Sequence, residues 1–416
     1  MCGKAGKKRI SEVNTRRKKA TIQVENMKIL IIDTIKLPEG SGWTTHKYEF
    51  SRNLSELGHE IHVMTYTGTK LNGVVAHYMK AKKNYKFAFI FKIVYLINIL
   101  KVIHAHNFDV LYTRNVSFGL LGILIKKISK TKFVLELNGL VSEHRKFEKK
   151  VYKIGVLKNL QMVKSDCIEI FVAKKADGVI AVTQKIKDIL VKRGVDGNKI
   201  TIVSNGANIN LFVPMNNSRA INELRNQYGI NENAPVVMFV GNLAYWQGVE
   251  YLIQSAPLVL KAIPDAMLLI VGNGGLKNEL INFAKKTGVP DKFIFTGNVA
   301  YQKVPLYMNM ADVCVVPKKI LGFGYSPVKL YEYMACGKPV VATNTAGFEI
   351  LEKYHAGVLV NPKNQHELSS AIIKLLQNKQ LREVMGANGR KLVAEEYSWE
   401  STAKKTVEVF RTLLKE

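Results

Sequence analysis

The sequence predicts an α/β protein made of two successive domains, each built on a parallel sheet. Short apolar runs, typical of fully buried strands, alternate with longer stretches of helical spacing along most of the chain. The alternation forms one series up to about residue 215 and starts again at Val236. At roughly 100–200 residues per domain, two domains are also what the length favours.

The first β-loop-α-β unit opens the folded part of the chain. Residues 27–33 are an apolar run, residues 38–42 form a glycine-containing turn, and residues 44–57 show helical spacing. Residues 61–64 then return as a strand, as in a parallel α/β sheet. Residues 1–26 precede this unit and are polar and basic, so we expect a disordered extension there, with Met27 as a candidate for the true start.

The remaining elements follow in the same order of strand and helix. The first series adds strands at residues 110–112, 133–137, 178–182 and 200–203. The second series predicts strands at residues 236–240, 267–271, 293–296, 312–317, 339–342 and 357–360. It predicts helices at residues 248–262, 276–286, 303–310, 366–377, 380–395 and 399–414. The economical architecture is a Rossmann-like pair with a cleft between the domains, in which ligands bind outside the carboxyl ends of the strands.

The composition is ordinary for a soluble globular protein, with 47% hydrophobic residues. The four cysteines show no metal-binding spacing, and we interpret them as reduced thiols of a cytoplasmic protein. Residues 1–26 lack the apolar centre of a signal peptide. The sequence also has no charge-free apolar run of about 18 residues, so we expect no membrane span.

The net charge of +28 is unevenly distributed, and residues 27–215 carry +16 of it. Such an excess favours an anionic partner, which could be membrane headgroups, a phosphorylated acceptor or nucleic acid. The alternative is a general enrichment in lysine. No nucleic acid is expected, because no RNA- or DNA-binding motif appears and aromatic residues are not interleaved with the basic cluster of residues 1–26.

Two segments within residues 80–132 combine apolar stretches with flanking lysines. Residues 87–103 follow four lysines, and the apolar part of residues 117–132 is followed by Lys126, Lys127 and Lys130. An apolar face with a lysine flank suits a helix that lies in an anionic membrane interface. The alternative is a pair of core helices of the α/β domain. The membrane interpretation would place the protein at the inner face of the cell membrane and favour a lipid-linked acceptor.

Glycine-rich turns follow three of the predicted strands in the second domain. They lie at residues 241–243, 271–275 and 295–299. Glycine lets phosphate oxygens approach the main chain, and amides at a helix N-terminus bind anions. Three such turns on one side of one sheet indicate a bound nucleotide, although each turn alone is equally well explained as a plain strand-to-helix connection.

Glu332 is the only acid between Gly322 and Val341. It lies about one turn into a helix that is predicted to start near Pro327. A carboxylate at this place can accept two hydrogen bonds from a ribose diol. The alternative is an acid that merely favours the first turn of a helix, and the residues alone do not decide between the two.

Together these motifs resemble those of the family 4 retaining glycosyltransferases, which have the two-domain GT-B fold. The segment Glu332–Val341, EYMACGKPVV, is similar to the family signature, and the likeness covers nearly all of residues 27–416. Further similar segments are Met27–Thr65, Ser204–Gly206, Gly241–Leu243, Gln247–Gly248, Gly272–Gly275, Ala311–Pro317 and Tyr397–Glu400. The resemblance implies an acceptor-binding domain at residues 27–215, a nucleotide-sugar-binding domain at 216–395, and a final helix at 396–416 that packs back on the first domain.

The implied activity is transfer of a sugar from a UDP- or GDP-sugar to a glycan or lipid-linked acceptor, with retention of anomeric configuration, in cell-envelope or glycoconjugate synthesis. By this resemblance Glu332 would bind the ribose, Gly297–Val299 would meet the base, and Gly42 would approach the donor phosphate or sugar. The sequence has no Asp-x-Asp motif, so no metal and no cofactor is expected. Cations and helix N-termini would then stabilise the leaving group.

The sequence departs from the family pattern at three places. Gly324 stands where the first of two glutamates is usual, Asn242 and Gln247 replace an Arg and a Lys, and Asn138, with His144 nearby, replaces a first-domain His. The pattern SPxKLxEYMA resembles a branch that lacks the first glutamate, so we interpret the losses as branch variation.

Lys329 and the amides of residues 322–326 then remain for the diphosphate. The expected catalytic residues are Glu332, Asn138 and His144. The expected donor-binding residues are Gly42, Gly241, Asn242, Gln247, Gly272, Gly297, Val299, Gly324, Tyr325, Ser326, Lys329 and Glu332.

Two other classes of function remain as alternatives, another GT-B-fold enzyme and a nucleic-acid-binding protein. A GT-B-fold nucleotide-sugar epimerase is disfavoured because Glu332 and its helix match the transferase pattern, and a phosphorylase would need a cofactor-lysine context that the sequence lacks. A nucleic-acid-binding protein without transferase activity is suggested by charge alone.

Overall fold

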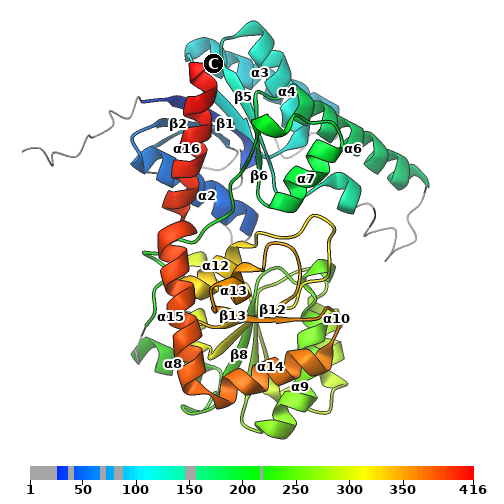
Figure 1. Ribbon diagram of the computed structural model, residues 1–416, viewed down its shortest axis with the longest axis vertical. Helices are drawn as coiled ribbons and strands as arrows, with labels where there is room; N and C mark the ends of the chain where they lie inside the picture. Colours follow the sequence, from blue (N-terminus) through cyan, green and yellow to red (C-terminus); the bar gives the residue numbers. More distant parts are fainter. Residues whose placement is uncertain are drawn as a thin grey trace, which may run out of the picture.

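The computed structural model describes residues 26–35, 42–65, 72–78, 88–144, 146, 156–215 and 219–416. The predicted extension before residue 26 and residues 38–41 of the first glycine-containing turn lie outside these ranges. Figure 1 shows two sheet-containing bodies stacked along the long axis, with α15 and α16 running along one side of both. Within the described residues, no helix is both long enough and apolar enough to span a membrane.

The first body holds a seven-stranded parallel sheet of order β3-β2-β1-β4-β5-β6-β7. Its strands are β1 (Lys28–Ile35), β2 (Glu60–Thr65), β3 (Val74–Tyr78), β4 (Val110–Thr113), β5 (Lys132–Leu137), β6 (Gly178–Ala181) and β7 (Ile200–Ile202). The predicted strands are confirmed, but β3 was not predicted. It is an edge strand whose side chains are half-buried or exposed, so it lacks the continuous apolar run of a central strand.

Helices cover both faces of this sheet. On one face lie α2 (Gly42–Glu56) and α16 (Trp399–Lys415), which share a core with β1, β2 and β4. The other face carries α3 (Ala88–Ala105), α4 (Val116–Ile128), α6 (Val156–Lys175) and α7 (Gln184–Lys192). Within the segment 117–132, the apolar part lies on α4, which ends at Ile128, and Lys132 already begins β5.

The second body holds a six-stranded parallel sheet of order β10-β9-β8-β11-β12-β13. Its strands are β8 (Val236–Val240), β9 (Met267–Val271), β10 (Phe293–Gly297), β11 (Val313–Val316), β12 (Val340–Thr343) and β13 (Gly357–Val360). Its helices are α8 (Arg219–Gln227), α9 (Val249–Ala262), α10 (Lys277–Lys285), α11 (Val304–Met310), α12 (Val328–Ala335), α13 (Ile350–Lys353), α14 (Gln365–Gln377) and α15 (Lys379–Glu396).

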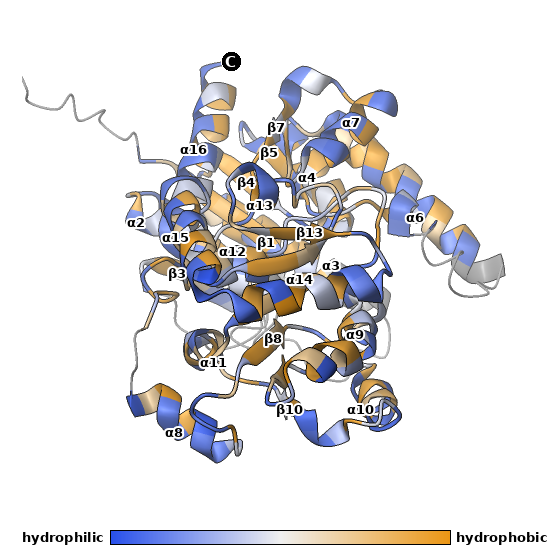
Figure 2. Ribbon diagram, turned by 60° about the horizontal axis from the view of Figure 1, so that its bottom comes forward, coloured by the Kyte–Doolittle hydropathy of each residue, from blue (hydrophilic) through white to orange (hydrophobic). Residues whose placement is uncertain are grey.

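Most predicted boundaries in this second series are confirmed to within one residue. The reason is that these strands are buried on both faces. Figure 2 shows hydrophobic strands inside and helices with hydrophilic outer sides. Such strands are continuous apolar runs, and such helices show apolar residues at helical spacing, so both are recognisable in the sequence. α8, in the polar segment after residue 215, was not predicted.

The final helix crosses back to the first body, as expected. The Ala207 amide donates to the Tyr397 carbonyl at 2.9 Å, and the Trp399 amide donates to the Ala207 carbonyl at 3.0 Å. A side chain at Gly206 would place its Cβ 2.6 Å from the carbonyl carbon of Ser398, so only glycine lets the two segments approach this closely. The two bodies are therefore joined both at residues 206–207 and along α16.

Candidate functional site

Three glycine turns meet at the carboxyl ends of adjacent strands β8, β9 and β10. The Gly241 amide donates to the Val271 carbonyl and the Gly272 amide to the Gly297 carbonyl, both at 2.9 Å. A side chain at Gly272 would place its Cβ 2.1 Å from the Gly241 carbonyl oxygen, so glycine is required there. The structure thus brings together three turns that the sequence indicated separately.

Helix α12 carries the residues at the centre of the site. The Tyr333 hydroxyl accepts a hydrogen bond from the Val240 amide at 2.7 Å, which anchors α12 to the carboxyl end of β8. The helix ends before Gly337, whose φ of 67° is typical of a glycine just past a helix terminus. Lys329 and Glu332 are three residues apart and so share one face of α12.

Lys329 lies against the first glycine turn. Its Nζ donates to Gln247 Oε1 at 3.1 Å and lies 3.9 Å from the centre of the Phe239 ring. A Cβ at Gly241 would come within 2.5 Å of the same Nζ. Burial lowers the pKa of Lys329 well below its usual value, and the nearby Lys318 lowers it further. The amino group of Lys329 therefore lies beside Gly241 and Gln247, in the segment where the resemblance predicts an Arg and a Lys that this chain lacks.

Glu332 is almost completely buried, with 6% of its surface exposed. Burial raises the pKa of Glu332 to about 8, and the Glu49 carboxylate raises it too, while Lys329 and a hydrogen bond with Tyr301 act in the opposite direction. The carboxyl group is therefore largely protonated at neutral pH when no ligand is bound.

The first body supplies Glu49 to the same place. This carboxylate, on α2, accepts hydrogen bonds from Asn208 Nδ2 at 2.9 Å and from the Tyr301 hydroxyl at 3.4 Å, and Arg52 lies 2.8 Å away. Burial raises the pKa of Glu49 despite these contacts. Neither Glu49 nor Tyr301 was predicted as a site residue, because no local motif marks either of them.

Two further lysines at the end of β11 were also missed. Lys318 is buried with its Nζ 4.3 Å from the centre of the Tyr325 ring, and burial alone lowers the pKa of Lys318 to about 7. Lys319 forms an ion pair with Glu250, and its Nζ lies over the ring of Tyr245. The available signal was their place directly after a buried strand, at the edge where ligands bind.

The loop before α12 connects the site to the first body. Gly324 has φ of 71°, and its Cβ position is blocked by the backbone of residue 346. The Thr183 hydroxyl donates to the Phe323 carbonyl at 2.8 Å, and the Asn205 amide donates to Ser326 Oγ at 3.0 Å. The side chain of Ser326 is thus engaged in holding the two bodies together.

Asn138 and His144 belong to the first body, on the segment that follows β5 and approaches Phe323 of this loop. Both are exposed and follow β5, and the ring centre of His144 is 5.1 Å from that of Phe323. A Cβ at Gly139, next to Asn138, would be 3.1 Å from the Phe323 ring. The structure therefore places His144 beside Phe323 of the loop that precedes α12, with Asn138 next to Gly139.

The other predicted donor-binding residues lie in both bodies. Gly42 is the first residue of α2, and residues 38–41 before it are outside the described ranges. Asn242 is exposed, with its Oδ1 next to Gly274. Val299 is half-buried, two residues after the last glycine of β10. None of these contacts Glu332 through an interaction that the structure records.

The carboxyl ends of β1, β4 and β5 carry a different charged group. Lys47 Nζ lies 3.6 Å from Asp33 Oδ2, and Arg114 Nε and His46 Nε2 lie 2.6 and 3.3 Å from Glu136 Oε1. Burial would raise the pKa of Glu136, but Arg114 and His46 outweigh it and bring the pKa to about 2. We call these five residues the first-domain network.

The arrangement around α12 suits an anionic ligand with hydroxyl groups. Two buried lysines have strongly lowered pKa values, and a buried carboxyl group lies on the same helix face as one of them. Shifts of this kind are typical of functional sites. Among the described residues, no group of three metal ligands lies at this edge of the second sheet.

Comparison with known proteins identifies two family matches. Residues 40–211 match the family described as Glycosyltransferase Family 4, and residues 220–392 match Glycosyl transferases group 1. An uncharacterized glycosyltransferase of Methanocaldococcus jannaschii is 25% identical over 413 residues, which covers 94% of this chain and 100% of that protein.

A second relative and one solved structure extend the comparison. A GDP-mannose-dependent alpha-(1-6)-phosphatidylinositol monomannoside mannosyltransferase of Mycobacterium tuberculosis is 30% identical over 211 residues, which are 50% of this chain and 54% of that relative. The structure of sucrose-phosphate synthase from Thermosynechococcus elongatus superimposes with a TM-score of 0.77 at 19% identity, covering 93% of this chain and 99% of that one. This likeness shows the shared two-domain fold.

Proposed function

The chain belongs to the family 4 glycosyltransferases, which transfer a sugar from a nucleotide-sugar donor, and we propose that it moves a hexose with retained configuration to a glycan or lipid-linked acceptor. The observation that carries the proposal is the set of Lys318, Lys329 and Glu332 at the carboxyl ends of the second sheet. Burial shifts the pKa of each of these three groups toward its neutral form, and a nucleoside diphosphate would offer phosphate charge to the two lysines and ribose hydroxyls to Glu332.

Glu332 is the proposed ribose-binding residue. An ionised carboxylate accepts hydrogen bonds from both hydroxyls of a ribose diol, and no other acid lies on α12. The raised pKa means that ionisation of Glu332 costs free energy in the free protein. Protonation of Lys329 beside a bound diphosphate would reduce that cost, because Lys329 lowers the pKa of Glu332.

Lys329 and Lys318 are the proposed diphosphate-binding residues. Lys329 already contacts Gln247, one of the two positions where family members often have a basic residue. A diphosphate next to these side chains would favour their charged forms and raise both pKa values. The charge that the leaving nucleotide develops would then be stabilised by two cations and the amides of residues 322–326.

A GDP-sugar is the first donor to test, and a UDP-sugar is the alternative. Support for GDP comes from the mycobacterial relative, which uses GDP-mannose and shares 30% identity over half of this chain. The base is expected to meet the main chain of residues 297–299, where amides and carbonyls rather than side chains would select it.

The proposed acceptor is linked to a lipid, and the support is an apolar stripe on the first domain. Leu120, Leu124 and Ile128, spaced four apart on α4, are 43%, 44% and 65% exposed. Leu160 and Phe171 are exposed on α6, which packs against α4. With the excess of lysine in this domain, such a surface suits an anionic membrane interface at the inner face of the cell membrane. α6 was not part of the predicted segment 80–132, and residues 79–87 lie outside the described residues.

A donor assay tests the transferase proposal. The purified chain is incubated with GDP-mannose, UDP-glucose and related donors, with and without a lipid extract, and release of nucleoside diphosphate is measured. We expect turnover with one nucleotide class that increases with the extract. No turnover with any donor, together with tight salt-dependent RNA binding, would favour the nucleic-acid alternative.

Vesicle co-sedimentation tests the lipid proposal separately. We expect binding to vesicles that contain anionic lipid and loss of binding in Leu120→Ser/Leu124→Ser. The matched control is Val384→Ser, because Val384 is similarly exposed, at 50%, but lies on α15 of the second domain. Equal vesicle binding by both variants would show that the exposed residues of α4 do not bind the membrane, and it would not affect the proposal for the donor site.

A further inference from the structure

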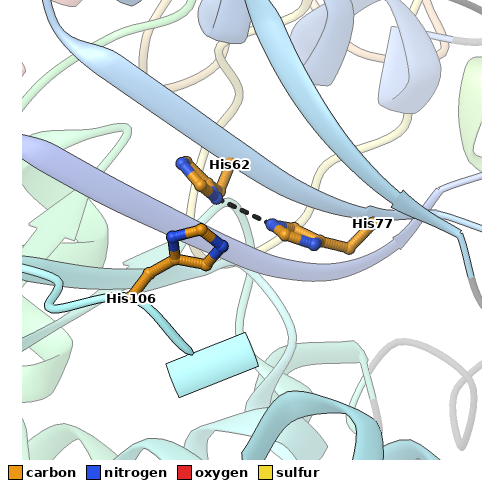
Figure 3. A group of neighbouring side chains, drawn as sticks. All are labelled: His62, His77 and His106. Carbon is orange, nitrogen blue, oxygen red and sulfur yellow. Dashed lines mark hydrogen bonds between the residues drawn. The ribbon is translucent and has the colours of Figure 1, made fainter. Parts of the chain in front are cut away.

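Three histidines from separate elements converge on the first sheet. His62 lies on β2, His77 on the edge strand β3, and His106 just after α3. One ring nitrogen of each lies within 4.8 Å of the corresponding nitrogens of the other two. Figure 3 shows the three rings gathered around a common point, with His62 and His77 joined by a hydrogen bond.

The strand register explains why the first two rings meet. His77 pairs with Met64 in the parallel ladder, and residues 62 and 64 point to the same face of β2. That face is covered by α3, whose Ile99 shares a core with Met64. Glu49 lies on α2, which covers the opposite face, so the histidine cluster is separate from the donor site.

A neighbouring carboxylate orients the His62 ring. Glu60 Oε1 lies 2.7 Å from His62 Nε2 and 3.1 Å from Lys28 Nζ. Because Glu60 also forms an ion pair with Lys28, it acts as a carboxylate, which only accepts hydrogen bonds. His62 Nε2 therefore carries the proton, and the lone pair of Nδ1 faces His77 Nε2 at 2.7 Å. A carboxylate that orients a histidine in this way is the usual support of a metal ligand.

We propose that His62 Nδ1, His77 Nε2 and a ring nitrogen of His106 bind a divalent transition-metal ion, with zinc as the reference ion. Imidazole suits zinc, copper and nickel, and three protein ligands leave a fourth position for water. Zinc–nitrogen bonds of about 2.05 Å in a tetrahedral site set the nitrogens about 3.3 Å apart. The pair at 2.7 Å must therefore separate by about 0.6 Å.

Binding requires little rearrangement of protons. His62 already presents a lone pair, and His77 presents one when its proton moves from Nε2 to Nδ1. The buried ring of Phe108, with its centre 5.0 Å from that of His62, covers one side of the cluster.

The ion would stabilise the edge of the first sheet. β3 has few buried side chains, and the cluster would tie it to β2 and to the end of α3. We therefore assign the ion a structural role that is independent of sugar transfer.

The test is metal binding by the full chain, with any affinity tag removed and after treatment with a chelator. Zinc affinity is measured by competition with a chromophoric chelator, and cobalt(II) is used for its visible d–d absorption, which reports a low-coordinate nitrogen site. We expect one ion per chain. At 100 times Kd, zinc should raise Tm by about 5 °C.

Matched variants locate the ion. His77→Gln and His106→Gln should weaken zinc binding at least 100-fold and abolish the cobalt bands, and Glu60→Gln should weaken it about 10–100-fold. His104→Gln is the control, because His104 is exposed and lies two residues before His106. Circular dichroism of each variant checks folding. The proposal is overturned if the wild-type chain binds no ion, or if His77→Gln and His104→Gln bind it equally.

Discussion

The two domains use buried charge in opposite ways at the carboxyl ends of their sheets. In the first-domain network, Glu136 faces Arg114 and His46, and its pKa falls to about 2. In the second domain, Lys329 faces the neutral Gln247, and burial raises the pKa of Glu332 to about 8. At the carboxyl ends of the strands, the first domain therefore holds a carboxylate whose charge is balanced by neighbouring cations. The second domain holds ionisable groups whose charges lack such neighbours.

The difference separates architecture from function. Buried charges that neutralise each other need no ligand, and removing one partner is costly, whereas buried charges that lack compensation cost free energy until a complementary ligand arrives. We therefore expect variants in the first-domain network to affect stability and variants around α12 to affect nucleotide binding.

The largest expected effect is on stability, in Glu136→Gln. The change leaves the Arg114 guanidinium buried without its counter-charge, which should lower the free energy of unfolding by about 3–5 kcal/mol. Urea unfolding measures the loss. Glu408→Gln, an exposed residue paired with Arg411 on α16, is the control and should change stability by less than about 0.5 kcal/mol. If Glu136→Gln folded normally but lost nucleotide binding, the division between the domains would be wrong.

The next largest effect is on catalysis, in Glu332→Gln. The amide keeps the shape of the side chain but loses the charge that accepts the ribose hydrogen bonds, so kcat/KM for the donor should fall about 100-fold. Tm should stay within a few degrees of wild type, because the carboxyl group is largely protonated in the free protein. Wild-type kinetics in this variant would remove Glu332 from the donor site.

A smaller effect is expected for the lysines. Lys329→Met and Lys318→Met should each weaken nucleoside diphosphate binding about 10-fold, the size of one charge-assisted contact, and leave the affinity for the free nucleoside unchanged. Lys338→Met is the control: Lys338 is half-buried in the second domain, and its Nζ donates to the Asn309 carbonyl. Equal losses for diphosphate and nucleoside would show that the lysines act on folding rather than on phosphate.

The smallest effect is a proton linkage. The pKa of Lys318 is about 7 in the free protein and should rise when a diphosphate binds, as should that of Lys329. Glu332 releases its proton when it ionises to hold the ribose, but two lysines take up protons against this one release, so binding takes up protons overall. Affinity should therefore fall as the pH rises above about 7. Calorimetry in buffers of different ionisation enthalpy measures the uptake, which should decrease in Lys318→Met. Proton release on binding would contradict this sign.

The sequence predicted the fold well where burial is two-sided. Strands such as residues 236–240 are apolar throughout because helices cover both faces, and their bounds were found correctly. The edge strand β3 was missed because exposure on its outer side breaks the apolar run. Membership of the family was also predicted, whereas the motif branch remains a prediction.

The site was predicted only where one continuous motif holds it. Glu332 and Lys329 lie eight residues or fewer from the glycine loop, so one motif revealed them together. Glu49 and Tyr301 reach the same place from residues far apart in the chain, and no spacing rule connects them. The histidine cluster was missed for the same reason, since β-sheet pairing and not sequence spacing brings His62 and His77 together. The roles of all the predicted site residues, Glu332 and Lys329 as well as Asn138 and His144, stay predictions.

The most direct test of the central claim pairs a change in the protein with a change in the ligand. Kd is measured for the nucleoside diphosphate that binds and for its 2′,3′-dideoxy form, with wild type and with Glu332→Gln. If Glu332 holds the ribose hydroxyls, the dideoxy form should bind wild type about 100-fold more weakly but bind the variant within about threefold of the parent nucleotide. The same loss in both proteins would show that Glu332 does not contact the ribose, and the proposed donor geometry would be wrong.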